Sequence, residues 1–178
     1  EEKILTEYRE RRYRHQIRHE RLVSFEVRVQ ETDLLILADS NLSEFAQDVI
    51  YRVRGPLEGY IAQYPEFLNA MTPLPYDKLA PPVVREMLAA AQSCGAGPMA
   101  AVAGALAENI GRHLLAFTDE VVIENGGDVF LAVKKAAIVG IDAGRSPLKR
   151  KLGLRVAASG MPLAICTSSG TIGHSLSY

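Results

Sequence analysis

The sequence predicts an α+β domain in which helices pack on one side of an antiparallel sheet. Apolar and polar side chains alternate with a period close to two over residues 22–30, and residues 34–38 form a second apolar strand. Residues 42–53 carry apolar side chains at helical spacing. Short Val- and Ile-rich segments return after residue 121. Strands before and after a helical region are typical of an antiparallel sheet with helices on one face.

The N-terminal strands are expected to pair as a hairpin. We expect its turn at Thr32–Asp33 and a further short strand near residues 13–17. Asn41 followed by Glu44 resembles a capping box at the start of the first helix. That helix is expected to kink or break at Gly55–Pro56, because proline lacks the backbone N–H that the helix needs.

Two more helices are expected after a proline-rich loop. The first runs from Pro82 to about Ser93 and ends at Gly95, and the second runs from Pro98 to about Arg112. Five short strands complete a β-β-α-α-α-β-β-β-β-β order, and they are expected at residues 121–124, 129–133, 136–141, 154–158 and 163–167.

Composition predicts one globular domain over residues 1–178. Hydrophobic residues make up 48% and charged residues 23% of the chain, which is enough for a core without disulfides. The formal net charge of −1 argues against nucleic acid or an acidic membrane as a partner. No apolar run is long enough to span a bilayer, so we expect a cytoplasmic protein. Cys94 and Cys166 form no CxxC motif and are expected to be small buried side chains.

The N-terminal segment from Glu7 to Arg21 is rich in arginine. It carries six arginines, three glutamates and two histidines. A nucleic-acid-binding strip is one interpretation. The interleaved glutamates favour the other, a solvated strand or one that faces a second subunit of a homo-oligomer.

The helix predicted from Pro98 is unusually bare, with Gly104 among several alanines. Small side chains let a ligand or a neighbouring backbone approach closely. The glycines at Gly95 and Gly97 leave backbone N–H groups accessible at the helix start, where an anion would be favoured. A helix pressed against the sheet explains the same pattern, and both interpretations stay open.

A second candidate segment joins two of the predicted strands. Asn125–Gly126 is a strong hairpin signal, because both central residues of such a turn need a positive φ. A minimal hairpin does not need the additional Gly127 followed by Asp128. Bare backbone with one carboxylate beside it would suit a ring or ribose edge, so this turn is expected to face a pocket.

A third candidate segment follows the last predicted strand. Thr167, Ser168, Ser169 and Gly170 could bind a phosphate or a carbonyl, or could form an ordinary polar turn. The Gly-x-Ser-x-Gly spacing of a nucleophile elbow is missing. His174 lies shortly afterwards, and no triad is indicated by its spacing.

Four stretches of the second half together carry a resemblance. They are residues 97–104 (Gly-Pro-Met-Ala-Ala-Val-Ala-Gly), 122–128 (Val-Ile-Glu-Asn-Gly-Gly-Asp), 139–142 (Val-Gly-Ile-Asp) and 167–170 (Thr-Ser-Ser-Gly) with His174 after it. In order and spacing they resemble the ApbE superfamily, which includes the FAD:protein FMN transferases. The resemblance covers about residues 95–178 and implies a T-fold-like α+β domain.

The resemblance implies a flavin nucleotide, FAD or FMN, as the ligand. Gly97 would lie beside the flavin, and the cofactor would also contact Asn125, Gly126, Gly127, Asp128, Thr167, Ser168, Ser169 and Gly170. His174 would occupy the catalytic position. In the transferases Mg²⁺ bridges the FAD pyrophosphate, a hydroxyl of an acceptor protein attacks the FMN-side phosphorus, and AMP leaves.

Departures from the transferase pattern point to a compact ApbE-like branch. The interval between the Ser-Gly loop and His174 is shorter, and the long N-terminal half has no clear match. The family's metal-ligand segment, an Asp-Ala-x-x-Thr-like stretch, is expected beyond Tyr178, together with the C-terminal end of the domain. We therefore expect flavin nucleotide binding with poor or absent FMN transfer. The alternative is a non-catalytic nucleotide-binding protein or an oligomeric scaffold.

Overall fold

The protein is an antiparallel sheet with helices on one face. A computed structural model describes residue 14, residues 21–141, residue 147 and residues 151–166. Five strands form a sheet in the order β1-β2-β3-β4-β7, while β5 and β6 form a separate two-stranded sheet. The strand bounds are β1 (Val23–Val29), β2 (Thr32–Ala38), β3 (Val121–Asn125), β4 (Asp128–Ala132), β5 (Ala137–Gly140), β6 (Gly153–Val156) and β7 (Leu163–Ile165).

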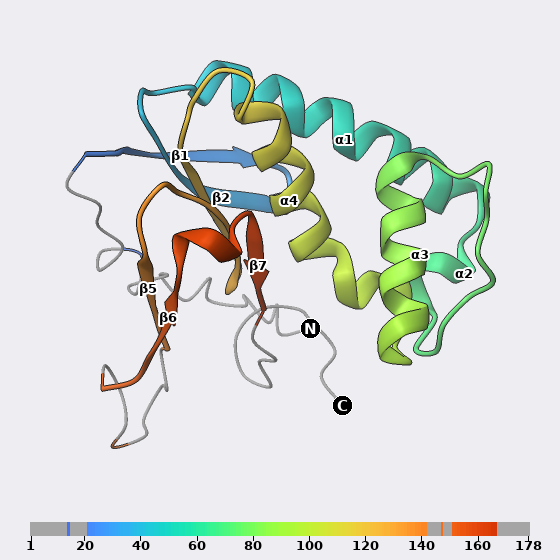
Figure 1. The fold of residues 1–178 in the computed structure, drawn as a ribbon. Helices are drawn as coiled ribbons and strands as arrows, with labels where there is room; N and C mark the ends of the chain where they lie inside the picture. Colours follow the sequence, from blue (N-terminus) through green and yellow to red (C-terminus); the bar gives the residue numbers. More distant parts are fainter. Residues whose placement is uncertain (1–13, 15–20, 142–146, 148–150, 167–178) are drawn as a thin grey trace, which may run out of the picture.

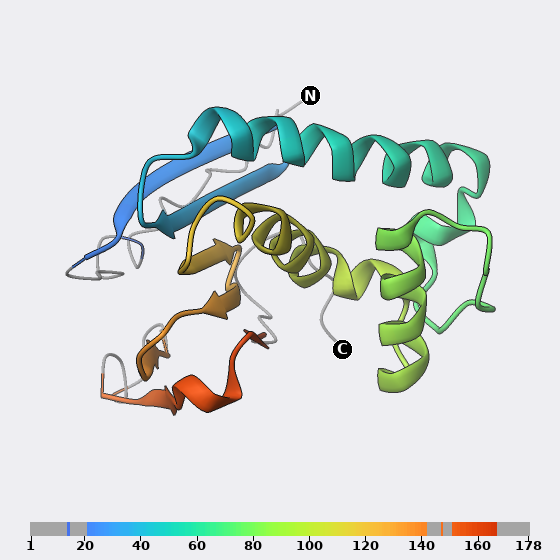
Figure 2. The same cartoon turned by 45° about the horizontal axis from the view of Figure 1, so that its top comes forward.

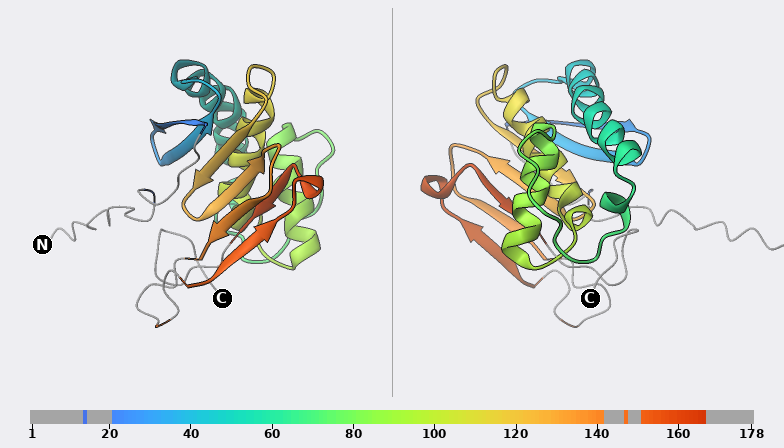
Figure 3. Two further views of the ribbon diagram at one scale, coloured as in Figure 1. Left: turned by 60° about the vertical axis from the view of Figure 1, so that its left-hand side comes forward. Right: turned by 90° about the vertical axis from the view of Figure 1, so that its right-hand side faces the viewer.

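The helices lie together against one side of the five-stranded sheet (Figure 1; Figure 3, right). This arrangement and the element order confirm the predicted fold class. The bounds are α1 (Ser43–Gln63), α2 (Glu66–Asn69), α3 (Pro82–Cys94) and α4 (Val102–Leu114), with 3₁₀ turns η2 (Pro98–Ala101) and η3 (Ala158–Gly160). The sequence analysis missed the single turn α2 and joined η2 and α4 into one helix.

The first hairpin turns two residues earlier than predicted. Val29 pairs with Thr32, so the turn is Gln30–Glu31, and Gln30 takes a φ of 53°. Thr32 and Asp33 are instead buried inside β2. Polar partners hold them there, because Arg54 donates a hydrogen bond of 2.6 Å to the Thr32 hydroxyl. Of the strand predicted at residues 13–17, only Arg14 lies within the described residues, and it is not in a strand.

Helix α1 runs along β1 and β2 without a break (Figure 2). It continues through Pro56, so the predicted break is wrong. A continuous buried stripe that includes Val53 and Leu57 on either side of the proline explains this, because packing outweighs the missing hydrogen bond. The predicted capping box is also absent: Asn41 accepts a hydrogen bond from the Ser43 backbone N–H at 3.0 Å, and no side chain caps the helix.

The main core lies between the helices and the sheet. Strand β2 is its centre, since all seven of its residues are buried. A smaller apolar cluster covers the opposite face of the sheet and consists of Leu22, Leu35, Leu37 and Val133. No helix in the described part of the chain has the length and apolar character needed to span a membrane.

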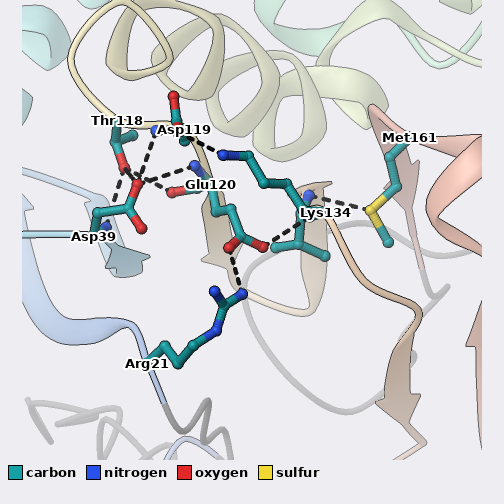
Figure 4. Close-up of polar contacts among 8 residues, drawn as sticks. Arg21, Asp39, Thr118, Asp119, Glu120, Lys134 and Met161 are labelled. Carbon is teal, nitrogen blue, oxygen red and sulfur yellow. Dashed lines mark hydrogen bonds and ion pairs between the residues drawn. The ribbon is translucent and has the colours of Figure 1, made fainter.

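A polar network ties the sheet to the loop before β3 (Figure 4). Asp39, just after β2, accepts a hydrogen bond of 2.8 Å from the Thr118 hydroxyl. Glu120 is buried, and its two carboxylate oxygens accept hydrogen bonds of 2.7 Å from Arg21 and from the Lys134 backbone N–H. Arg21, one of the N-terminal arginines, therefore contributes to the fold itself.

Helix α4 packs closely against β4 at a glycine. A Cβ added at Gly111 would lie 2.4 Å from Cδ1 of Phe130, and Phe130 is almost fully buried. Only a residue without a side chain allows this distance between helix and strand. The close approach positions the rest of α4 over the end of the sheet where β3 and β4 turn.

We predict that Gly111→Ala lowers the free energy of unfolding by about 1–3 kcal/mol, the usual cost of overpacking a core. The measurement is urea denaturation followed by circular dichroism. Gly59→Ala is the matched control, because Gly59 is exposed in α1 with nothing within 4 Å of an added Cβ. That control should gain about 0.5–1 kcal/mol from helix propensity. Equal midpoints for the two variants would contradict the close packing at Gly111.

Candidate functional site

The predicted glycine hairpin is present, but its centre differs from the prediction. Asn125 pairs with Asp128, so the two turn residues are Gly126 and Gly127, with φ values of 65° and 107°. The sequence analysis placed Asn125 at the turn and treated Gly127 as surplus. Both glycines are in fact needed by the turn itself, because both take a positive φ. The second glycine is therefore no independent sign of a pocket.

Asn125 stays in β3 because its side chain is tied to the neighbouring helix. Its Nδ2 donates a hydrogen bond of 3.0 Å to the backbone carbonyl of Ala103 in α4. The Asn125 side chain is buried by this contact. Its role shown by the structure is to hold the hairpin against the bare helix.

Glu124 holds the turn from the other side. Its Oε1 accepts a hydrogen bond of 2.9 Å from the Gly127 backbone N–H. Its Oε2 accepts a hydrogen bond of 2.6 Å from Nε of Arg14. Glu124 is only 1% exposed, so this carboxylate is compensated by hydrogen bonds inside the protein rather than by water.

Arg14 connects this carboxylate to the first hairpin. Its Nη1 and Nη2 donate hydrogen bonds of 2.8 and 2.7 Å to the Asp33 carboxylate and backbone carbonyl. Burial by itself would lower the pKa of Arg14. The hydrogen bonds and charges of Asp33 and Glu124 outweigh burial and raise that pKa above its usual value. This network was not predicted from the sequence. The arginine-rich N-terminal segment was the one feature that could have indicated a buried arginine.

Asp128, a predicted site residue, and Cys166, which is distant in the sequence, meet beside the small-residue helix α4. Strand β4 pairs with β7, with Val129 opposite Ile165, and this register brings Asp128 next to Cys166. A Cβ added at Gly104 would lie 3.4 Å from Asp128 Oδ2 and 3.6 Å from Cys166 Sγ. The hairpin turn, the first turn of α4 and the end of β7 therefore converge on one point.

The Cys166 thiol is held in its neutral form at this point. Its pKa is raised to about 11, first by desolvation and then by the charge and hydrogen bond of Asp128. Cys166 as a whole residue is exposed, and so is Cys94. The prediction that both cysteines are buried small side chains is therefore wrong.

Of the other predicted site residues, only Gly97 lies within the described part of the chain. A Cβ at Gly97 would fall 1.7 Å from the Ala70 carbonyl oxygen, so the backbone after α2 packs directly on Gly97. Residues 167–170 and His174 lie outside the described residues.

A hollow of about 240 Å³ lies away from this point, at the far end of α1. Its lining is aromatic and acidic and includes Tyr60, Tyr64, Glu66, Phe67 and Asp77. The Tyr60 hydroxyl donates a hydrogen bond of 3.2 Å to Asp77. Burial and Asp77 both raise the pKa of Tyr60. The sequence analysis did not find this hollow, although two tyrosines at i and i+4 before a proline-rich loop were a possible signal.

Comparison with known proteins assigns the chain to a family. The family model described as "AbpE bacteria" matches residues 14–178. The chain belongs to this family. Similar curated proteins are the UPF0280 proteins of Methanococcus aeolicus (36% identical over 163 residues), Methanocella arvoryzae (40% over 151) and Methanocaldococcus jannaschii (37% over 153). These alignments cover 84–88% of this chain but only 61–65% of each relative. The chain therefore spans less than two thirds of the length of these relatives.

We predict that Cys166 reacts slowly with iodoacetamide at mildly alkaline pH, because the reactive thiolate is scarce below a pKa of about 11. Asp128→Asn should speed the reaction by removing a nearby negative charge. The thiol should still react more slowly than in the urea-unfolded chain, because desolvation persists. Mass spectrometry of labelled protein in a Cys94→Ser background measures the rate. Equal rates for folded and unfolded protein would contradict the assigned environment.

Proposed function

We propose that the protein binds a flavin nucleotide, FMN or FAD, where the Gly126–Gly127 turn, helix α4 and the end of β7 converge. One observation carries the proposal. Asp128, Gly104 and Cys166 come from three separate segments, two of them singled out by the ApbE resemblance, and lie within contact distance of one another. The match to the AbpE bacteria family spans residues 14–178 and so includes all three segments.

The chemistry at this point favours the ring or ribityl part of a flavin. The Asp128 carboxylate accepts hydrogen bonds, so it suits a ring N–H or a ribityl hydroxyl. A phosphate beside it would meet a like charge, so we place the phosphate away from Asp128. Gly104 and the two turn glycines offer backbone without side chains, which a flat ring can approach closely.

FMN transfer by an ApbE-like protein would also use Mg²⁺, which neutralises charge on the phosphates. Among the described residues, no three His, Cys, Asp or Glu side chains are grouped so that they could hold a metal ion. Asp128 is the only one of the predicted site residues that carries a carboxylate. We therefore assign no magnesium ligands among the described residues.

We further propose that binding occurs with little or no FMN transfer. In transfer, an acceptor hydroxyl oxygen would bond to the FMN phosphorus, the pyrophosphate P–O bond would break, and AMP would leave. That reaction depends on accurate placement of the groups around the phosphorus. The interval between the Ser-Gly loop and His174 is shorter here than in the transferases, and this difference favours binding over transfer.

We predict that Asp128→Ala weakens FMN binding by about 1–3 kcal/mol, the scale of a hydrogen bond to a charged group. Quenching of flavin fluorescence in a titration measures the affinity. Asp48→Ala, which removes an exposed carboxylate from α1, is the control and should leave the affinity unchanged. Failure of the wild-type protein to bind FMN or FAD at high micromolar concentration would overturn the proposal. Equal FMN affinity of Asp128→Ala and the wild type would overturn the proposed position of the flavin beside Asp128.

We predict no covalent flavin on an acceptor protein after incubation with FAD, Mg²⁺ and Ser- or Thr-containing proteins. A denaturing gel viewed under ultraviolet light is the measurement, and a known FMN transferase with its acceptor is the positive control. A fluorescent acceptor band would disprove the absence of transfer while leaving the binding proposal intact.

A further inference from the structure

The glycine turn is tied down by a buried carboxylate. A chain with two adjacent glycines has more accessible backbone conformations than any other pair of residues. Here the Gly127 N–H donates a hydrogen bond of 2.9 Å to Glu124 Oε1, a side chain three residues before it. The ladder pair between Asn125 and Asp128 already closes the hairpin. The added bond therefore restricts the turn beyond what pairing of the strands requires.

This hydrogen bond between Glu124 and the Gly127 N–H, called the tether below, depends on a residue far away in the sequence. Glu124 Oε2 accepts a hydrogen bond of 2.6 Å from Nε of Arg14, across a separation of 110 residues. Side-chain exposures are 7% for Arg14 and 2% for Glu124. A buried carboxylate without a positive partner is strongly disfavoured. Arg14 therefore gives the Glu124 carboxylate a buried hydrogen-bonding partner under the turn, and the Asp33 contacts fix the guanidinium in place.

The turn leads directly into the proposed ligand contact. Asp128 follows Gly127, and its carboxylate lies over Gly104 of α4. The Gly127 backbone sets the direction in which β4 begins at Asp128. A restraint on the Gly127 N–H is thus also a restraint on the position of Asp128.

We propose that Glu124 is a positioning residue, supported by Arg14, that holds the Gly126–Gly127 turn and Asp128 in the arrangement that binds the flavin. The inference rests on the function proposed above and names the groups that preorganise its site. Glu124 and Arg14 would act through the turn and would not contact the ligand. Their effect is to remove freedom from the turn before the ligand arrives.

Two double variants of the full chain separate the tether from the ion pair. Arg14→Met with Glu124→Gln removes both charges but keeps an amide oxygen that can accept the Gly127 N–H. Arg14→Met with Glu124→Met removes the same charges and the acceptor at similar volume. Both leave Asp33 without Arg14, so they differ only in the side-chain amide of residue 124, whose oxygen is the acceptor for the Gly127 N–H. We measure the melting temperature, the hydrogen exchange of the Gly127 amide by NMR, and FMN affinity by fluorescence.

The glutamine variant should protect the Gly127 amide and bind FMN at least tenfold more tightly than the methionine variant at a similar melting temperature. Equal FMN affinities in the two variants, alongside binding by the wild type, would overturn the positioning role and leave the proposed function standing. A wild type that binds no flavin would overturn both. If neither variant folds, the hydrogen exchange of the Gly127 amide in the wild type tests the inference. Exchange as fast as in an open turn would overturn it. Strong protection of this amide from exchange, increasing when FMN binds, would support it.

Discussion

The close approach of helix α4 to strands β3 and β4 is the constraint on which the candidate site depends. Gly111 allows it, because any side chain there would overlap the Phe130 ring. Near the start of the same helix, the Ala103 carbonyl accepts a hydrogen bond from the Asn125 side chain, and this bond fixes the hairpin to α4. These two contacts determine that Gly104 lies over Asp128. The small residues of α4 are thus needed for close packing of the helix on the sheet. The same small residues leave space that a ligand could occupy.

Buried charge is the second feature that shapes the region. Removal of one partner from a buried ion pair typically costs about 3–5 kcal/mol, because the other charge is left uncompensated. Arg14 and Glu124 are both nearly inaccessible, and Asp33 completes the set. Replacement of buried ion pairs by apolar side chains is often neutral for stability. A role in fixing the turn is therefore a better reason for this arrangement than stability alone.

The sequence predicted the architecture well because periodicity reports directly on which face of an element is buried. It located the helix end at Gly95, whose φ of 72° favours glycine, and it located the five strands that the structure describes after residue 120. It misjudged both hairpin turns by one or two residues. In each case a polar residue that favours turns, Asp33 or Asn125, lies in a strand, where its side chain makes a hydrogen bond with a distant segment of the chain. Such long-range partners leave no local pattern.

Two acidic residues four positions apart have different roles because their surroundings differ. Glu124 is buried and bonded to a guanidinium and a backbone N–H, so its oxygens are used within the fold. Asp128 is only partly buried and lies beside the Cys166 thiol, whose pKa it helps to raise. A neutral thiol adds no charge of its own, and the Asp128 carboxylate can accept hydrogen bonds from a ligand. A phosphate directly beside this carboxylate would meet a like charge, so the proposed flavin is placed with its ring or ribityl part there.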